Sequence, residues 1–221
     1  VTKKYFEGKV ISSLDTFKQE RFDYSLNGIK YFCYIDIYNE NGADINIIEV
    51  KATTSKKFVD LGKKEHSIFY KKDNIYYLKD EIGYDYTEEM TPKEYNNYKN
   101  KLYDRFKEGK YVFDLAVQRY FIEGEYRNSK NEAKLKNIKY YLAVLNHEYI
   151  YNGSPDYDID DDGNAIVTFI DLTRVSADLQ KVVDTNRILL EGCLKDNRIT
   201  SYPLGIYCEH KKQTECKYFK K

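Results

Sequence analysis

Three charged residues on two neighbouring apolar segments have the types and the spacing of a metal-dependent hydrolytic site. Asp36 follows an aromatic run, and Glu49 and Lys51 lie two positions apart in a second run rich in isoleucine. If the segments form an antiparallel hairpin about a turn at 41–42, the pairing places Asp36 opposite Ile47. Side chains alternate across a strand, so this register predicts that Asp36, Glu49 and Lys51 share one face.

The chemistry of these groups suits hydrolysis of a phosphate ester. Two carboxylates in an apolar setting need a proton or a cation. Their oxygens are the ligands that Mg²⁺ or Mn²⁺ prefers, and the backbone carbonyl of Val50 is a further candidate ligand. The Lys51 ammonium would then orient or deprotonate a metal-bound water, or stabilise a pentacovalent phosphate. The alternative is an ordinary ion pair on a solvated face, because the pattern Glu-x-Lys is common.

The remaining elements predict an α/β fold, a mixed β-sheet flanked by helices. Residues 1–20 have a loosely helical pattern, and Asn27-Gly28 is typical of a hairpin turn. Thr91 and Pro92 are typical of a helix start, and Ser176 is expected to cap the last helix. The expected strands are 21–26, 29–37, 44–52, 138–149 and 166–172, with a short hairpin near 75–78. The expected helices are 93–108, 110–127 and 176–194.

Composition limits the classes of protein that fit. The chain has 221 residues, which favours one domain, 1–221, with a lysine- and tyrosine-rich insertion at about 53–92 and a cysteine-containing tail at about 203–221. Its 36 basic and 36 acidic residues exclude a uniformly basic nucleic-acid binder. No apolar run is long enough for a membrane span and no signal peptide is evident, so we expect a cytoplasmic protein. Because the chain begins at Val1, we expect a piece of a longer one.

In their order and spacing the motifs resemble the PD-(D/E)XK nuclease superfamily, in its RecB-like branch. They are similar to CRISPR-associated iron–sulfur exonucleases and, more so, to a group of uncharacterised bacterial RecB-like proteins. The resemblance covers about residue 17 to the end and implies a restriction-endonuclease-like sheet. The matching residues are Gln19-x-x-Phe22, Asp36, Glu49-Val50-Lys51, Asp114-Leu115-Ala116-Val117-Gln118-Arg119-Tyr120, Leu145-Asn146-x-x-Tyr149 and the tail cysteines.

The resemblance implies a role for each residue of the core. Asp36 and Glu49 would hold the metal, and Lys51 would be the catalytic lysine. Gln118 matches the glutamine motif of the RecB-like branch, and Tyr120 lies near the position of its tyrosine, although the spacing here is Q-R-Y rather than Q-x-x-x-Y. Asp114 lies four residues before Gln118, on the same helix face, and would brace it.

Further residues are expected around this core. An acid or histidine from an N-terminal helix completes the site in the family, and the candidates here are Gln19 and Glu20. The hydroxyls of Thr53, Thr54 and Ser55, just past the Glu-x-Lys triplet, are candidates to meet a phosphate. An acidic segment, Asp158-x-Asp160-x-Asp162, has the start of a calcium-loop pattern but lacks its final glutamate, and we expect a hairpin loop there.

The tail carries two cysteines, Cys208 and Cys216. Similar proteins hold a 4Fe–4S cluster with such cysteines and others elsewhere, so the resemblance implies a cluster in the full-length protein only. Two thiolates are too few for it; a zinc site with His210, or two free thiols, are the alternatives.

Two functions remain open at this point. The first is a Mg²⁺- or Mn²⁺-dependent DNA nuclease, for example an exonuclease, with a helicase or CRISPR-type protein as a conceivable partner. The second is an inactive nuclease-fold module that binds DNA or a protein. Eight lysines between residues 51 and 79, interleaved with Phe69, Tyr70, Tyr76 and Tyr77, would suit nucleic acid by charge and stacking, but a solvated lysine-rich segment would look the same.

Overall fold

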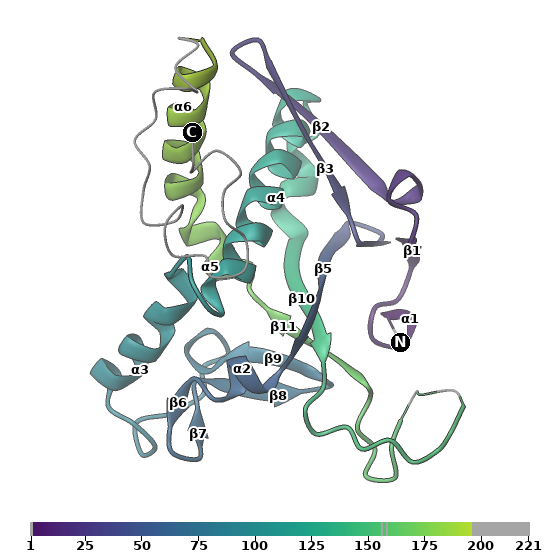
Figure 1. The fold of residues 1–221 in the computed structure, drawn as a ribbon, viewed down its shortest axis with the longest axis vertical. Helices are drawn as coiled ribbons and strands as arrows, with labels where there is room; N and C mark the ends of the chain where they lie inside the picture. Colours follow the sequence, from purple (N-terminus) through teal and green to yellow (C-terminus); the bar gives the residue numbers. More distant parts are fainter. Residues whose placement is uncertain (1, 156, 158, 196–221) are drawn as a thin grey trace, which may run out of the picture. The chain divides into compact units, whose positions relative to one another are not determined.

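A seven-stranded mixed β-sheet forms the centre of the fold in the computed structural model, which describes residues 2–155, 157 and 159–195 (Figure 1). The strand order across the sheet is β1-β4-β5-β10-β11-β9-β8. Strands β5 and β10 are parallel, as are β9 and β11, and the other neighbours are antiparallel. The strands are β1 (Lys9–Ser12), β4 (Ile37–Asn41), β5 (Asp44–Thr54), β8 (Phe69–Lys72), β9 (Ile75–Leu78), β10 (Ile138–Leu145) and β11 (Val167–Asp171). The predicted α/β fold class is confirmed.

The hairpin that carries the charged residues differs from the predicted one in two ways. The predicted strand 29–37 is broken at Asp36, where the chain bends. Before the bend, β3 (Ile29–Ile35) pairs with β2 (Glu20–Leu26) in a separate two-stranded sheet, and after it β4 pairs with β5. The turn between β4 and β5 falls at residues 42–43 rather than at 41–42, so Ile37 lies opposite Ile48.

This register is two residues from the predicted one, and a shift of two keeps every side chain on its face. Continuing the pairing by one step brings Asp36 level with Glu49 rather than with Ile47. The register on which the shared face was based was wrong, and since Asp36 lies at the bend, outside both strand ladders, its place on the face of Glu49 and Lys51 stays a prediction.

Helix α4 (Gly109–Asn128) covers the face of the sheet toward which Glu49 and Lys51 point. Its residues Val112 and Leu115 are fully buried in one cluster with Ile47 of β5 and Leu142 of β10. Ile48, which points the other way, packs in a second cluster with Phe6 and Phe169 on the opposite face. The alternation along β5 thus separates the two layers.

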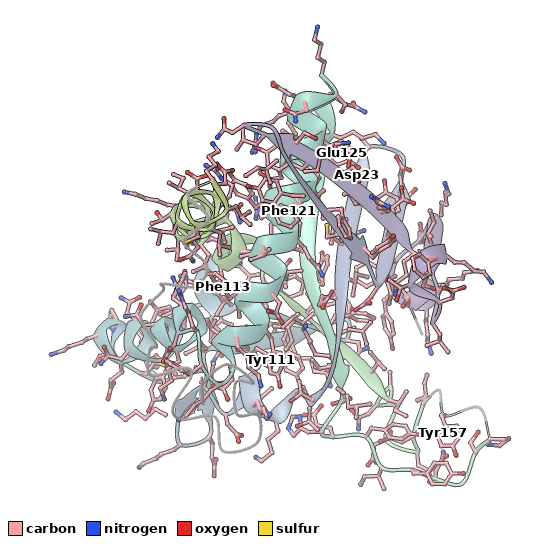
Figure 2. All side chains as sticks on the ribbon, turned by 45° about the horizontal axis from the view of Figure 1, so that its top comes forward. Asp23, Tyr111, Phe113, Phe121, Glu125 and Tyr157 are labelled. Carbon is pink, nitrogen blue, oxygen red and sulfur yellow. The ribbon has the colours of Figure 1, made fainter. Side chains whose placement is uncertain are left out.

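The β2–β3 hairpin packs against α4 (Figure 1). Asn27 and Gly28 form its predicted turn with φ of 52° and 79°, both in the left-handed region that a two-residue hairpin turn requires. Figure 2 shows Asp23 of β2 next to Glu125 of α4, and the Asp23 backbone N–H donates to Glu125 Oε2 at 2.6 Å. The hairpin is therefore held against the helix that supplies part of the candidate site.

Replacing Gly124 of α4 with alanine is expected to lower the free energy of unfolding by about 1–3 kcal/mol. The added Cβ would lie 2.6 Å from the ring of Tyr24, which is itself held between Tyr31 and Tyr120. In a helix interior the same change ordinarily stabilises a protein by about 0.5–1 kcal/mol. A loss of stability here would therefore show that Gly124 packs closely against Tyr24. Denaturant unfolding is the measurement. Gly192→Ala in α6 (Gln180–Lys195), where a Cβ meets nothing within 4 Å, is the matched control. Unchanged or raised stability of Gly124→Ala would contradict the packing.

Several other predictions are corrected or confirmed along the chain. Residues 1–20 are not one loose helix, because β1 follows α1 (Thr2–Tyr5) and pairs with β4. Helix α3 (Pro92–Lys99) begins as predicted, with Thr91 and Glu94 in a capping box, but it ends at Lys99 and not at 108. Ser176 is not a helix cap, since it lies inside α5 (Thr173–Asp178), with its side chain buried.

The remaining elements are short. Two of the strands that belong to the main sheet, β8 and β9, come from the segment predicted as an insertion, 53–92. Residues up to Val183 form one compact unit, and the described residues after it, 184–195, continue α6. The short elements are α2 (Lys56–Val59), β6 (Gly62–Lys63), β7 (His66–Ser67) and the 3₁₀ turns Thr16–Lys18, Lys79–Glu81, Asn100–Tyr103 and Glu132–Asn137.

Candidate functional site

The bend at Asp36 places its carboxylate beside β5. Asp36 Oδ2 accepts the backbone N–H of Val50 at 2.9 Å, and Oδ1 accepts the side-chain amide of Gln19 at 3.2 Å. The N–H and C=O of one residue point to the same side of a strand, so the Val50 carbonyl is directed to the side on which Asp36 lies. Of the two N-terminal candidates, Gln19 is the one that contacts Asp36.

Glu49 is buried beside Asp36. Its Oε1 lies 2.9 Å from Lys51 Nζ, and its Oε2 accepts the amide of Gln118 at 2.6 Å. Burial raises the pKa of Glu49, and the negative charge of Asp36 raises it further, against the lowering effect of its bonds to Lys51 and Gln118. The charges of the two carboxylates are thus close enough to repel each other.

Lys51 lies between two carboxylates, with its Nζ 2.9 Å from both Glu49 Oε1 and Asp114 Oδ2. Partial burial acts to lower the pKa of Lys51, but the hydrogen bonds and charges of Glu49 and Asp114 outweigh it and raise the pKa above its ordinary value. Lys51 is therefore an ammonium group at neutral pH. This favours orienting water or stabilising a phosphate over deprotonating water, two roles that the sequence left open.

The spacing of residues on β5 and α4 explains why these contacts form. Asp114 and Gln118 are one helical turn apart, a rise of about 6 Å. Glu49 and Lys51 are two strand residues apart, about 6.6 Å. The two pairs therefore match in length, and α4 places Asp114 at Lys51 and Gln118 at Glu49. The predicted shared face of Asp114 and Gln118 is confirmed, although Asp114 braces Lys51 and not Gln118.

A groove of about 710 Å³ gives solvent access to Asp36. Gln19, Asp36 and Val50 line it together with Ser12, Thr16 and Ala52. Within the same cluster Gln118 Oε1 is buried and has no hydrogen-bond partner among the described residues. The groove therefore opens on Asp36 and Val50, whereas neither Glu49 nor Lys51 lines it.

The donor set fits a divalent cation that keeps most of its water. Mg²⁺ is commonly held by one or two carboxylates together with waters and substrate phosphates. Asp36 and Glu49 supply two carboxylates, and the Lys51 ammonium pairs with Glu49 and with Asp114. Within the part of the chain that the structure describes, no group of three or more Asp, Glu, His or Cys residues is arranged to bind a metal by itself. A metal here would therefore depend on water or substrate oxygens for its remaining ligands.

Comparison with protein families, curated proteins and solved structures finds no match for the chain.

The other predicted site residues are Tyr120, Glu20, Thr53 and the tail cysteines. Tyr120 packs edge-on against Tyr24 of β2, with ring centroids 5.8 Å apart. Glu20 lies opposite Ile35 in the β2–β3 ladder. Thr53 is buried near the carboxyl end of β5. Cys208 and Cys216 fall outside the described residues, so the cluster and zinc predictions concern a part of the chain that the structure does not describe.

The lysine-rich segment is less basic and less aromatic at its surface than its composition suggests. Phe69 and Tyr76 are buried in the core, which leaves Tyr70 as the most exposed of its four rings, tilted against Tyr84. Several of its lysines pair with acids, namely Lys56 with Asp60, Lys63 with Glu94, Lys71 with Glu148 and Lys79 with Glu89. Stacking of bases on Phe69 and Tyr76 is therefore excluded in this conformation.

The acidic segment is a loop, as predicted, and the structure shows that Asp160 holds it together. Asp160 Oδ1 accepts the backbone N–H groups of Asp162 and Asn164 at 3.0 and 2.7 Å, and Oδ2 accepts that of Ile150 at 3.0 Å. The carboxylate thus organises its own loop.

A second pocket was not predicted from the sequence. It has a volume of about 390 Å³ and is lined by Glu81 and Asp171, which end up at the carboxyl ends of β9 and β11, and by Arg119, Lys139 and Arg174. Burial and then the charge of Asp171 raise the pKa of Glu81 to about 7. No motif could have signalled this pocket, because its residues come from distant segments and its acids are balanced by bases.

Among the described residues, no helix is long and apolar enough to cross a membrane.

Proposed function

We propose that the chain is a metal-dependent nuclease that hydrolyses phosphodiester bonds of DNA with a metal-activated water. The observation that carries the proposal is the position of Lys51. Its ammonium is fixed 2.9 Å from Glu49, and Glu49 is close enough to Asp36 for the two charges to interact. Two neighbouring carboxylates, Asp36 and Glu49, with the fixed ammonium of Lys51 beside one of them, favour a divalent cation and a phosphate at this place. The same residues carry the resemblance to the PD-(D/E)XK nucleases.

Each side chain has a role under this proposal. A bound Mg²⁺ or Mn²⁺ would lower the pKa of a coordinated water and polarise the phosphate. Asp36, Glu49 and the Val50 carbonyl would hold the metal. Lys51 would orient the attacking water and stabilise the negative charge that develops on the phosphate. Asp114 would fix Lys51.

Gln118 and Gln19 would support the two metal ligands. Gln118 bonds to one oxygen of Glu49, and Gln19 bonds to one oxygen of Asp36. Since the amide of each glutamine is an uncharged donor, it restrains its carboxylate without neutralising the charge that the metal needs.

The test is incubation of the protein with end-labelled single- and double-stranded DNA in Mg²⁺ or Mn²⁺, and again in EDTA. Degradation that requires the metal supports the proposal. Stable DNA in both metals, at protein concentrations that saturate binding, would overturn it.

A second candidate is a nuclease-fold module that binds DNA or a protein without cutting. One observation favours it: each oxygen of Asp36 and Glu49 is already paired with a donor of the chain itself. A network satisfied in this way needs no metal. Salt-sensitive DNA binding that divalent cations neither strengthen nor convert into cleavage would favour this candidate.

A further inference from the structure

Three lysines surround the ring of Tyr111, in the first turn of α4. Lys110 Nζ lies 4.7 Å from the ring centroid, Lys57 Nζ 5.8 Å and Lys51 Nζ 6.0 Å. They come from α4, α2 and β5, so the fold rather than the local sequence brings them together. Figure 2 shows Tyr111 at the opposite end of α4 from Glu125.

Two of these lysines carry unbalanced charge. Lys51 is paired with Glu49 and Asp114, whereas Lys57 and Lys110 form no ion pair with a carboxylate among the described residues. The contrast with Lys56 is direct, since that neighbour of Lys57 pairs with Asp60 at 2.9 Å. The region around Tyr111 therefore presents two exposed positive charges beside the proposed catalytic lysine.

A buried hydroxyl adjoins this group. Thr53 is 7 % exposed, and its Oγ1 has no hydrogen-bond partner within the described part of the chain. An unpaired buried polar atom costs free energy and calls for a ligand or a water. Partial burial acts to raise the pKa of Tyr111, but the Thr53 hydroxyl, which lies near the phenol oxygen without forming a hydrogen bond to it in this structure, and the charges of Lys110 and Lys57 hold that pKa below its ordinary value. The phenol oxygen thus lies in surroundings that favour an anion.

We propose that Lys57 and Lys110, with the hydroxyls of Tyr111 and Thr53, bind a phosphodiester group of the nucleic-acid strand next to the one cut at Lys51. The inference rests on the proposed nuclease function. It predicts that the bound nucleic-acid strand passes over the first turn of α4. Two ammonium groups supply the charge, and the two hydroxyls supply short-range hydrogen bonds to the phosphate oxygens. Cation–π contacts alone would explain the lysines but not the unpaired hydroxyl of Thr53.

The experiment measures binding of a labelled single-stranded oligonucleotide by fluorescence anisotropy, in EDTA, across a range of salt concentrations. Each phosphate contact with a single strand contributes about 0.7 to the slope of log K against log salt. The double variant Lys57→Gln with Lys110→Gln should therefore lose about 1.4 of the slope. The matched control is Lys30→Gln with Lys136→Gln, which removes the same charge from exposed positions on β3 and the 3₁₀ turn Glu132–Asn137 and should keep the slope.

Two further measurements test the roles of the hydroxyl and of the phosphate. Thr53→Val removes the hydroxyl at nearly constant volume, and it should weaken oligonucleotide binding without changing the slope of log K against log salt. Inorganic phosphate should compete with the strand, and its competition should weaken when Lys57 and Lys110 are replaced. Phosphate binding that needs Lys57 and Lys110, alongside strand binding that does not, would assign the place to free phosphate and overturn the inference.

Three other outcomes overturn it: no binding by the unmodified protein, an unchanged slope in the Lys57 and Lys110 variant, or an equal loss in the control. Because binding is measured without metal, the inference fails separately from the proposed function. A protein that shows the predicted slopes but never cleaves keeps the inference and loses the nuclease proposal.

Discussion

Replacing Lys51 with methionine is expected to lower kcat for DNA cleavage by about 10²–10³-fold, the size of effect seen when one fixed donor to a developing negative charge is removed. Methionine keeps most of the length and apolar volume of the side chain and removes the ammonium that lies 2.9 Å from Glu49 and Asp114. Because the loss concerns the transition state, DNA binding should fall much less than kcat. Single-turnover cleavage in Mg²⁺ measures the effect.

Lys56→Met is the matched control for this change. Lys56 is exposed and pairs with Asp60 on the surface, a pair of a kind that contributes about 0–1 kcal/mol. Its cleavage rate should stay within about twofold of the unmodified protein, as expected for a surface charge away from the reacting groups. If Lys51→Met kept the rate of the Lys56 variant, Lys51 would have no part in the chemistry.

Replacing Asp36 with asparagine is expected to abolish tight Mn²⁺ binding and to lower cleavage more than about 100-fold. Asparagine can still accept the N–H of Val50 through its oxygen, so the bend should survive while one anionic ligand is lost. Burial, the main cause of the raised pKa of Glu49, remains in this variant, but the smaller contribution from the charge of Asp36 is lost, so that pKa should fall. Isothermal titration with Mn²⁺ and cleavage assays measure the two effects.

The control for this variant is Asp44→Asn, an exposed position at the start of the same strand, β5. It removes the same charge and should bind Mn²⁺ as the unmodified protein does. Equal Mn²⁺ affinity in the Asp36 and Asp44 variants would show that Asp36 is not a metal ligand.

Patterns with a short range could be interpreted from the sequence. Alternation along residues 44–52 predicts a strand with Glu49 and Lys51 on one face, and both point to α4 in the structure. Thr91 and Pro92 predict the start of α3, because a cap acts within one turn. The four-residue spacing of Asp114 and Gln118 predicts their common face because a helix fixes it.

Features that depend on tertiary pairing could not be obtained in this way. The apolar run 29–37 continues across Asp36, so no turn signal in the neighbouring sequence predicts the bend after which β3 and β4 belong to different sheets. The hairpin register was off by two residues because both turns, at 41–42 and at 42–43, preserve the same alternation. The role of Asp114 as a partner of Lys51 depends on how α4 lies along β5, which no single segment specifies.

Crystallography with Mn²⁺ and anomalous diffraction tests the central claim most directly. The account predicts one strong anomalous peak within coordination distance of a carboxylate oxygen of Asp36 and one of Glu49, with Lys51 still held by Asp114. Diffraction data at saturating Mn²⁺ that show both carboxylates in place and no peak between them would contradict it.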